Sequence, residues 1–119
     1  MSFSVHRIYE DHAPGGRRIL VDRLWPRGVS KDEAGLDEWL KEAAPSTELR
    51  RWYGHEVDRF EEFVRRYRAE LGRPPGAAAA AHLLELAATE PVILLTATKD
   101  VAHSGARVLC DHLISLQGQ

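Results

Sequence analysis

The sequence predicts one small α/β domain, 1–119, in which a mixed or mainly parallel sheet of three or four strands is flanked by helices. The chain has 119 residues, a length that suits a single domain. Its apolar fraction of 44% is sufficient for one core, and its charged fraction of 29% is not that of a disordered chain. Short apolar runs stand at both ends of a long stretch with helical periodicity, an order that permits a right-handed crossover between parallel strands.

Three apolar runs are expected to be strands. They are residues 3–9, residues 18–24 with the branched run Ile19–Val21, and residues 92–96 directly after Pro91. The turn signal at 13–16, Ala-Pro-Gly-Gly, allows the first two strands to form a hairpin. Parallel pairing of these two strands through a wider loop remains open.

Helices are expected between the second and third strands and after the third. The first begins either at Ser30, which has capping-box spacing to Glu33, or after Gly35 with Leu36 and Trp39 on its inner face. Ser46 is a candidate N-cap for a short helix over 47–53. Apolar periodicity and alanine content predict the remaining helices over 56–71, from 77 through the following leucines, and from 101 or 104 to 116.

The overall charge does not favour a dedicated nucleic-acid-binding protein. The net charge is −2 and the pI about 6.3, whereas such proteins usually carry a basic excess. Residues 1–31, however, hold six basic and three acidic residues, a local balance of +3. This local excess is either surface variation or a means of attracting a small anion.

Cysteine content and hydropathy indicate a cytoplasmic protein without membrane association. Cys110 is the only cysteine, so an intrachain disulfide and a thiolate metal cluster are excluded, and its position in a helix suits a small buried filler. The first residues lack the apolar core of a secretion signal, and no apolar run approaches the length of a membrane span. The histidines show no metal-ligand spacing, and no cofactor is expected.

Polar residues that follow two of the predicted strands are the candidate site. Ligands of such sheets bind beyond the carboxyl ends of the strands, and arginine, lysine and a helix N-terminus all favour an anion there. The candidate ligand-binding residues are Arg23, Trp25, Arg27, Lys31, Ser46, His55, Lys99 and Ser104, and the candidate proton-handling residues are Asp22 and His103. Together they predict a recess for a phosphate or carboxylate group.

Several of these residues also have a purely structural interpretation. Neighbouring residues of a strand point to opposite faces, so Asp22 and Arg23 would diverge, and Asp22 would pair with an arginine such as Arg7. Trp25 would only fill the core, and the two histidines would be caps or surface residues. The segment 49–68 mixes arginines with aromatics, as single-strand-binding surfaces do, but its many acids favour a salt-bridged helix.

The run Arg18–Lys31, RILVDRLWPRGVSK, resembles the signature of YeaO-like proteins, the domain of unknown function family 488. Further similar residues extend the resemblance over residues 4–114; they are Trp39-Leu40, Ala44-Pro45-Ser46, Leu49, Arg50, Trp52 and Tyr53 with His55, Phe63, Arg66, Tyr67, Glu70 and Leu71, Leu94-Leu95, Lys99-Asp100, His103 and Val108-Leu109. The resemblance implies a compact α/β fold and no established reaction. Some members carry a Cys-His-Arg triplet near the last strand–helix loop, where this chain has Val101-Ala102-His103, so a thiol mechanism does not transfer.

Three functions follow as hypotheses. The first is binding of, or action on, a small anionic ligand, a class that includes nucleotide-like molecules. The second is association with nucleic acid through the N-terminal basic residues. The third is a non-catalytic interaction domain that presents the Trp-Pro-Arg-Gly loop and Trp52-Tyr53 to a partner. The sequence leaves the oligomeric state open.

Overall fold

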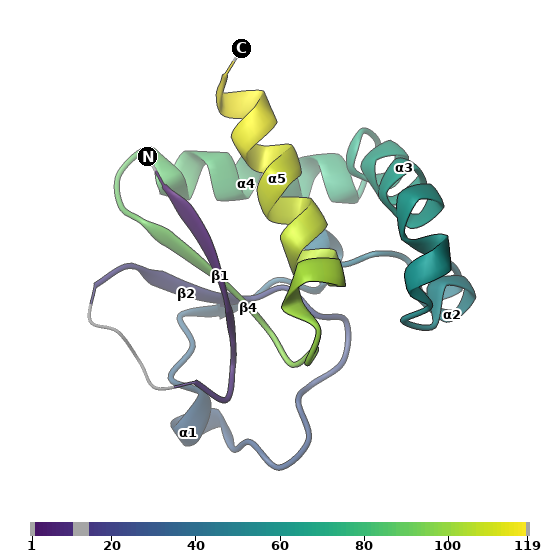
Figure 1. Ribbon diagram of the computed structural model, residues 1–119. Coiled ribbons are helices and arrows are strands. Elements are labelled where there is room, and N and C mark those ends of the chain that lie inside the picture. The colour runs from purple at the N-terminus through teal and green to yellow at the C-terminus, as the bar shows by residue number, and fades with distance from the viewer. Residues whose placement is uncertain (1, 11–14, 119) are drawn as a thin grey trace.

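The computed structural model describes residues 2–10 and 15–118, and Figure 1 shows how its elements are arranged. Of the turn expected at 13–16, the first two residues lie outside the described part of the chain. The elements run in the order β1 (Phe3–Arg7), β2 (Arg17–Leu20), α1 (Lys31–Ala34), β3 (Glu38–Trp39), η1 (Lys41–Ala43), α2 (Thr47–Tyr53), η2 (Val57–Arg59), α3 (Phe60–Leu71), α4 (Gly76–Ala87), β4 (Val92–Thr96), η3 (Val101–His103) and α5 (Gly105–Gln117).

The four strands form one parallel sheet in the order β1-β4-β2-β3, which confirms the predicted α/β class. The first two strands do not pair with each other, so the hairpin and the direct parallel pairing are both wrong: β4 lies between β1 and β2 and pairs with each of them (Figure 1). β4 is buried along its whole length. A strand with apolar side chains on both faces is stable at the centre of a sheet that is covered on both sides.

Both faces of the sheet are covered. Ile19 and Leu94 point to a core shared with α2, α3, α4 and α5. Their neighbours Leu20 and Leu95 point the other way, to a smaller core that includes Ala34 of α1. This alternation follows from the two-residue period of a strand. In Figure 1, α4 lies above the strands and α1 below them.

The segment after Gly35 differs from one of its two predictions. A capping box between Ser30 and Glu33 starts α1, and Gly35 ends it in the left-handed conformation with φ 56°. The alternative helix after Gly35 is wrong, because the chain there forms β3 and η1. Trp39 packs in the smaller core and Leu40 in the larger one, so neighbouring side chains point to opposite sides, as in a strand.

The other helices lie close to their predicted bounds. α2 spans 47–53, with the Ser46 hydroxyl accepting from the Leu49 amide and Gly54 ending the helix. The segment 56–71 begins with η2 before α3 continues to residue 71. β2 ends at Leu20, four residues before its predicted end, and this shorter strand changes the geometry of the site.

Candidate functional site

A cavity of about 380 Å³ lies at the carboxyl ends of β2 and β4. Ligand cavities in proteins typically measure about 300–1,000 Å³, and open parallel sheets bind ligands at this edge. The loop after β2 and the start of α5 both line it, so the two distant segments singled out in the sequence lie together. The lining residues are Tyr9, Val21, Asp22, Arg23, Leu24, Trp25, Pro26, Arg27, Ala44, Pro45, Arg50, Tyr53, His55, Phe63, Ala97, Thr98, Ser104, Gly105 and Ala106.

Asp22 joins the ends of β2 and β4 at the floor of this cavity. Its Oδ1 accepts a hydrogen bond from the Thr96 hydroxyl at 2.7 Å, and its Oδ2 accepts one from the Ala97 amide at 2.8 Å. Burial raises the pKa of the Asp22 carboxyl, although both hydrogen bonds and the nearby His55 partly oppose that rise. Within the described residues no arginine lies at ion-pair distance from Asp22, so the expected pair with Arg7 does not form.

Arg23 is held rigidly beside Asp22. Its Nε donates to the Pro45 carbonyl at 3.0 Å and its Nη2 to the Ala44 carbonyl at 3.3 Å. These two bonds fix the guanidinium in place and leave its charge without a carboxylate partner. Both residues line the same cavity because β2 has ended at Leu20, so the strand alternation that would separate them no longer applies.

Arg27 and Arg50 bring two further positive charges to the cavity, where their side chains are exposed. Arg27 belongs to the loop after β2, and Arg50 lies on the face of α2 that also carries Tyr53. Among residues 2–10 and 15–118, no acidic side chain forms an ion pair with Arg23, Arg27 or Arg50. Three guanidinium groups without an ion pair therefore line one recess, in which Asp22 is the single carboxylate among the described lining residues.

The first turn of α5 completes the polar lining. Ser104 caps this helix, since its hydroxyl accepts from the Arg107 amide at 3.1 Å and donates to the Val101 carbonyl at 2.7 Å. The hydroxyl is thus occupied. The amides of Gly105 and Ala106 precede the first intrahelical hydrogen bonds and have no acceptor within the described part of the chain. They add positive potential at the cavity wall.

His55 lines the cavity in a backbone conformation that is uncommon for residues other than glycine. Its φ is 59°, and it follows Gly54, whose φ is 53°. The left-handed conformation costs a residue with a Cβ atom roughly 1–2 kcal/mol, and such residues concentrate at functional sites. The conformation places the exposed imidazole near Asp22, whose pKa it lowers.

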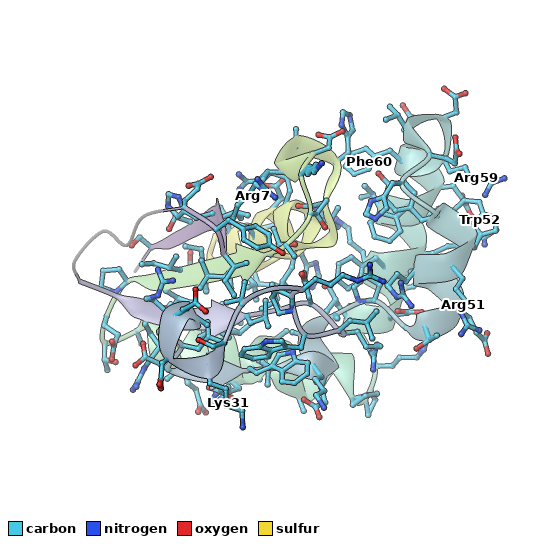
Figure 2. All side chains as sticks on the ribbon, turned by 90° about the horizontal axis from the view of Figure 1, so that it is seen from below. Arg7, Lys31, Arg51, Trp52, Arg59 and Phe60 are labelled. Carbon is cyan, nitrogen blue, oxygen red and sulfur yellow. The ribbon has the colours of Figure 1, made fainter. Side chains whose placement is uncertain are left out.

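Four of the predicted residues are not part of the cavity lining. Lys31 projects outward from α1 (Figure 2), and Lys99 is exposed in the loop after β4. Ser46 caps α2, and its amide and hydroxyl both donate to the Glu70 carboxylate, at 2.8 and 2.6 Å. His103 bonds Asp100 through Nδ1 at 2.8 Å.

The sequence does not predict several of the lining residues. It places Arg50 in the salt-bridged segment and gives no signal for Tyr9, Tyr53 or Phe63 as lining residues. A signal for two of them exists, because Arg50 and Tyr53 are three residues apart and so share a face of the predicted helix over 47–53. Nothing local indicates that this face turns toward the carboxyl ends of the strands.

Part of the positive charge of the segment 49–68 is compensated within the segment. Arg65 and Arg66 both bond Glu62, and these bonds lower the Glu62 pKa to about 2. The guanidinium groups of Arg59 and Arg66 lie over the ring of Trp52, 5.4 and 4.2 Å from its centre. Tyr53 is buried, and its hydroxyl donates to the His103 carbonyl. The pair Trp52-Tyr53 is therefore not a free aromatic surface.

No group of three His, Cys, Asp or Glu side chains among the described residues is placed to hold a metal ion. Within the same residues, no helix has both the length and the hydropathy that crossing a membrane requires.

Comparison with known proteins identifies the family. A family model described as the inactive DUF488-N3 subclade matches residues 2–117. The chain belongs to the DUF488 family. It is 41% identical over 117 residues to the uncharacterized protein YeaO of Escherichia coli, covering 98% of this chain and all of the relative.

Mycobacterial relatives support the same assignment. The uncharacterized protein Rv3073c of Mycobacterium tuberculosis is 47% identical over 110 residues, which cover 92% of this chain and 91% of the relative. A protein of Mycobacterium bovis, uncharacterized protein Mb3100c, matches equally well. No solved structure matches. These matches confirm the resemblance to YeaO-like proteins, of which residues 18–31 carry the signature.

Proposed function

We propose that this DUF488 protein binds a small organic anion in the cavity at the carboxyl ends of β2 and β4. The observation that carries the proposal is the charge of the lining: Arg23, Arg27 and Arg50 face one recess with no carboxylate partner among the described residues. Guanidinium groups bind carboxylates and phosphates through paired N–H donors. The free amides at the start of α5 strengthen the same preference.

The rigidity of the lining supports binding by a preformed site. Arg23 is fixed by two carbonyls, and Asp22 by the Thr96 hydroxyl and the Ala97 amide. A ligand that meets already ordered groups loses less conformational freedom on association. The cavity size also suits a small molecule and not a polymer.

The proposal is binding without covalent catalysis. The matching family model is described as inactive. The one cysteine, Cys110, is fully buried in α5, and burial raises its pKa, so it is not a thiolate nucleophile at neutral pH. Asp22 and His55 are the groups that would orient a ligand or take up its proton.

The experiment compares an arginine of the cavity lining with an arginine outside it. Inorganic phosphate and acetate are titrated into the wild type, Arg27→Gln and Arg51→Gln, and binding is measured from changes in the amide chemical shifts. Arg51 is an exposed arginine of α2 outside the cavity lining, and its side chain projects outward in Figure 2. The wild type and R51Q should show saturable shifts of the Gly105 and Ala106 amides, and R27Q should weaken binding about 10-fold or more, the effect of losing a charged hydrogen bond.

Equal weakening in both variants would indicate unspecific attraction and overturn the proposal. Saturable shifts confined to another surface would do the same. A single-stranded oligonucleotide in a parallel titration tests the nucleic-acid alternative, which predicts binding that phosphate weakens no more than sodium chloride does at the same ionic strength.

A further inference from the structure

The walls of the proposed anion site are mostly apolar, which a simple inorganic anion does not require. Leu24 and Tyr9 line the mouth while 61% and 47% exposed, and Phe63 lines the buried side. Exposed apolar side chains that gather at a cavity mouth are typical of ligand-binding surfaces. Phosphate or acetate bound to the arginines would leave these walls in water.

The aromatic residues of the wall present ring surface and not hydroxyl donors. The Tyr9 hydroxyl donates to the Arg27 carbonyl at 3.2 Å, and the Tyr53 hydroxyl donates to the His103 carbonyl at 2.7 Å. Trp25 donates its Nε1 proton to the Val29 carbonyl at 2.7 Å. Each of these protons is used, and most of the rings are also packed: Tyr53 stacks on Phe63 with 4.1 Å between ring centres, and Trp25 meets Trp39 edge-on at 5.2 Å. Arg7 lies over the Tyr9 ring at 4.9 Å, and the exposed remainder of that ring is the aromatic surface that a flat ligand can contact.

Asp22 supplies an acceptor in the same cavity. Each of its oxygens accepts one hydrogen bond, whereas an ionised carboxylate has about four acceptor positions. No positive side chain among the described residues pairs with it, and its raised pKa reflects the poor solvation of its charge. A ligand that brings an N–H or O–H group to Asp22 would relieve that poor solvation.

We infer that the ligand of this site is an aromatic acid with a hydrogen-bond donor on its ring, such as a phenolic hydroxyl or a ring N–H group. The aromatic ring occupies the space between Tyr9, Leu24 and Phe63. The donor bonds Asp22 on the inner side, and the acidic group lies among the arginines. This inference rests on the proposed function and adds two features of the ligand, an aromatic ring and a hydrogen-bond donor on that ring.

Four probes separate the three features of the ligand. They are 4-hydroxyphenylacetate, phenylacetate, tyrosol (4-hydroxyphenylethanol) and acetate, measured with the full chain by calorimetry or amide shifts. Phenylacetate lacks the ring donor, tyrosol lacks the charge, and acetate lacks the ring. We expect 4-hydroxyphenylacetate to bind at least 10-fold more tightly than each of the others.

Variants locate the effect in the cavity. Leu24→Ser should weaken the binding of 4-hydroxyphenylacetate several-fold more than it weakens the binding of acetate. Ile114→Ser, which changes another exposed apolar residue, 47% exposed and outside the cavity lining, should change neither. Asp22→Asn should reduce the advantage of 4-hydroxyphenylacetate over phenylacetate.

The outcomes distinguish this inference from the proposed function. If acetate and phosphate bind in the cavity and all aromatic acids bind no better, the inference is overturned and the anion site stands. If tyrosol binds as tightly as 4-hydroxyphenylacetate, the cavity is apolar without an anion site, and both proposals are overturned. If D22N binds 4-hydroxyphenylacetate and phenylacetate with an unchanged ratio, the assignment of the donor to Asp22 is wrong.

Discussion

The side chain of Asp22 should stabilise the fold as well as line the cavity, and replacing it by alanine or asparagine separates its hydrogen bonds from its charge. Asp22→Ala removes the acceptor of both the Thr96 hydroxyl and the Ala97 amide. Hydrogen bonds to a charged acceptor contribute about 1.5–3 kcal/mol each. Two effects reduce the net loss of unfolding free energy. Water in the cavity can bond the freed Thr96 and Ala97 donors, and the variant no longer buries a carboxylate.

The expected cost of D22A is therefore about 2 kcal/mol in the free energy of unfolding, less than the sum of two such bonds. A domain of 119 residues has an unfolding entropy of about 0.25 kcal/mol/K, so the melting temperature should fall by about 8 °C. Asp22→Asn keeps an oxygen for the Ala97 amide and an amide group next to the Thr96 hydroxyl. Its stability should stay within about 1 kcal/mol of the wild type.

Urea denaturation followed by circular dichroism measures both variants, and its pH dependence gives a second readout. The pKa of Asp22 is raised above 3.8 in the folded state, so between 3.8 and that raised value the folded protein binds more protons than the unfolded chain. This group therefore adds stability as the pH falls through that window, and D22N removes the addition. Equal urea midpoints for D22A and the wild type would refute the hydrogen-bonding role. A D22N midpoint as low as that of D22A would show that the negative charge of Asp22, and not the presence of hydrogen-bonding atoms at this position, stabilises the fold.

Two further predictions concern a buried and a partly buried group outside the cavity floor. Tyr67→Phe removes the donor to the buried Ala43 carbonyl and should cost about 1–3 kcal/mol of unfolding free energy in urea, whereas an unchanged midpoint would contradict a structural role for this bond. Burial lowers the pKa of His112, and the charge of Arg68 lowers it further. The unfolded chain therefore binds a proton at this position more readily than the folded protein does. The free energy of unfolding should consequently fall as the pH drops below 6.5. His112→Leu should flatten this part of the curve of stability against pH, and an unaltered slope would contradict the assignment.

The sequence predicts those segments in which the capping residue, the apolar pattern and the terminating residue all indicate the same element. α2 has a capping serine, an apolar face and a terminal glycine, and β4 is a short branched run after a proline; both occupy their predicted residues. The segment after Gly35 was ambiguous, because Leu36, Trp39, Leu40 and Ala43 fit a helical stripe. Tertiary contacts decide it, since Trp39 and Leu40 belong to cores on opposite sides of the sheet.

The residue at which β2 ends decides whether Asp22 and Arg23 can line the same cavity. If both were strand residues, they would point to opposite faces of the sheet, and at most one of them could lie in a site. The strand ends at Leu20, and the chain beyond it is held by side-chain bonds: Asp22 to the end of β4, and Arg23 to the carbonyls before α2. An acid and a base that are adjacent in sequence thus reach one recess without pairing with each other. Because each bonds a different segment, their charges remain available to a ligand that carries both an acidic group and a hydrogen-bond donor.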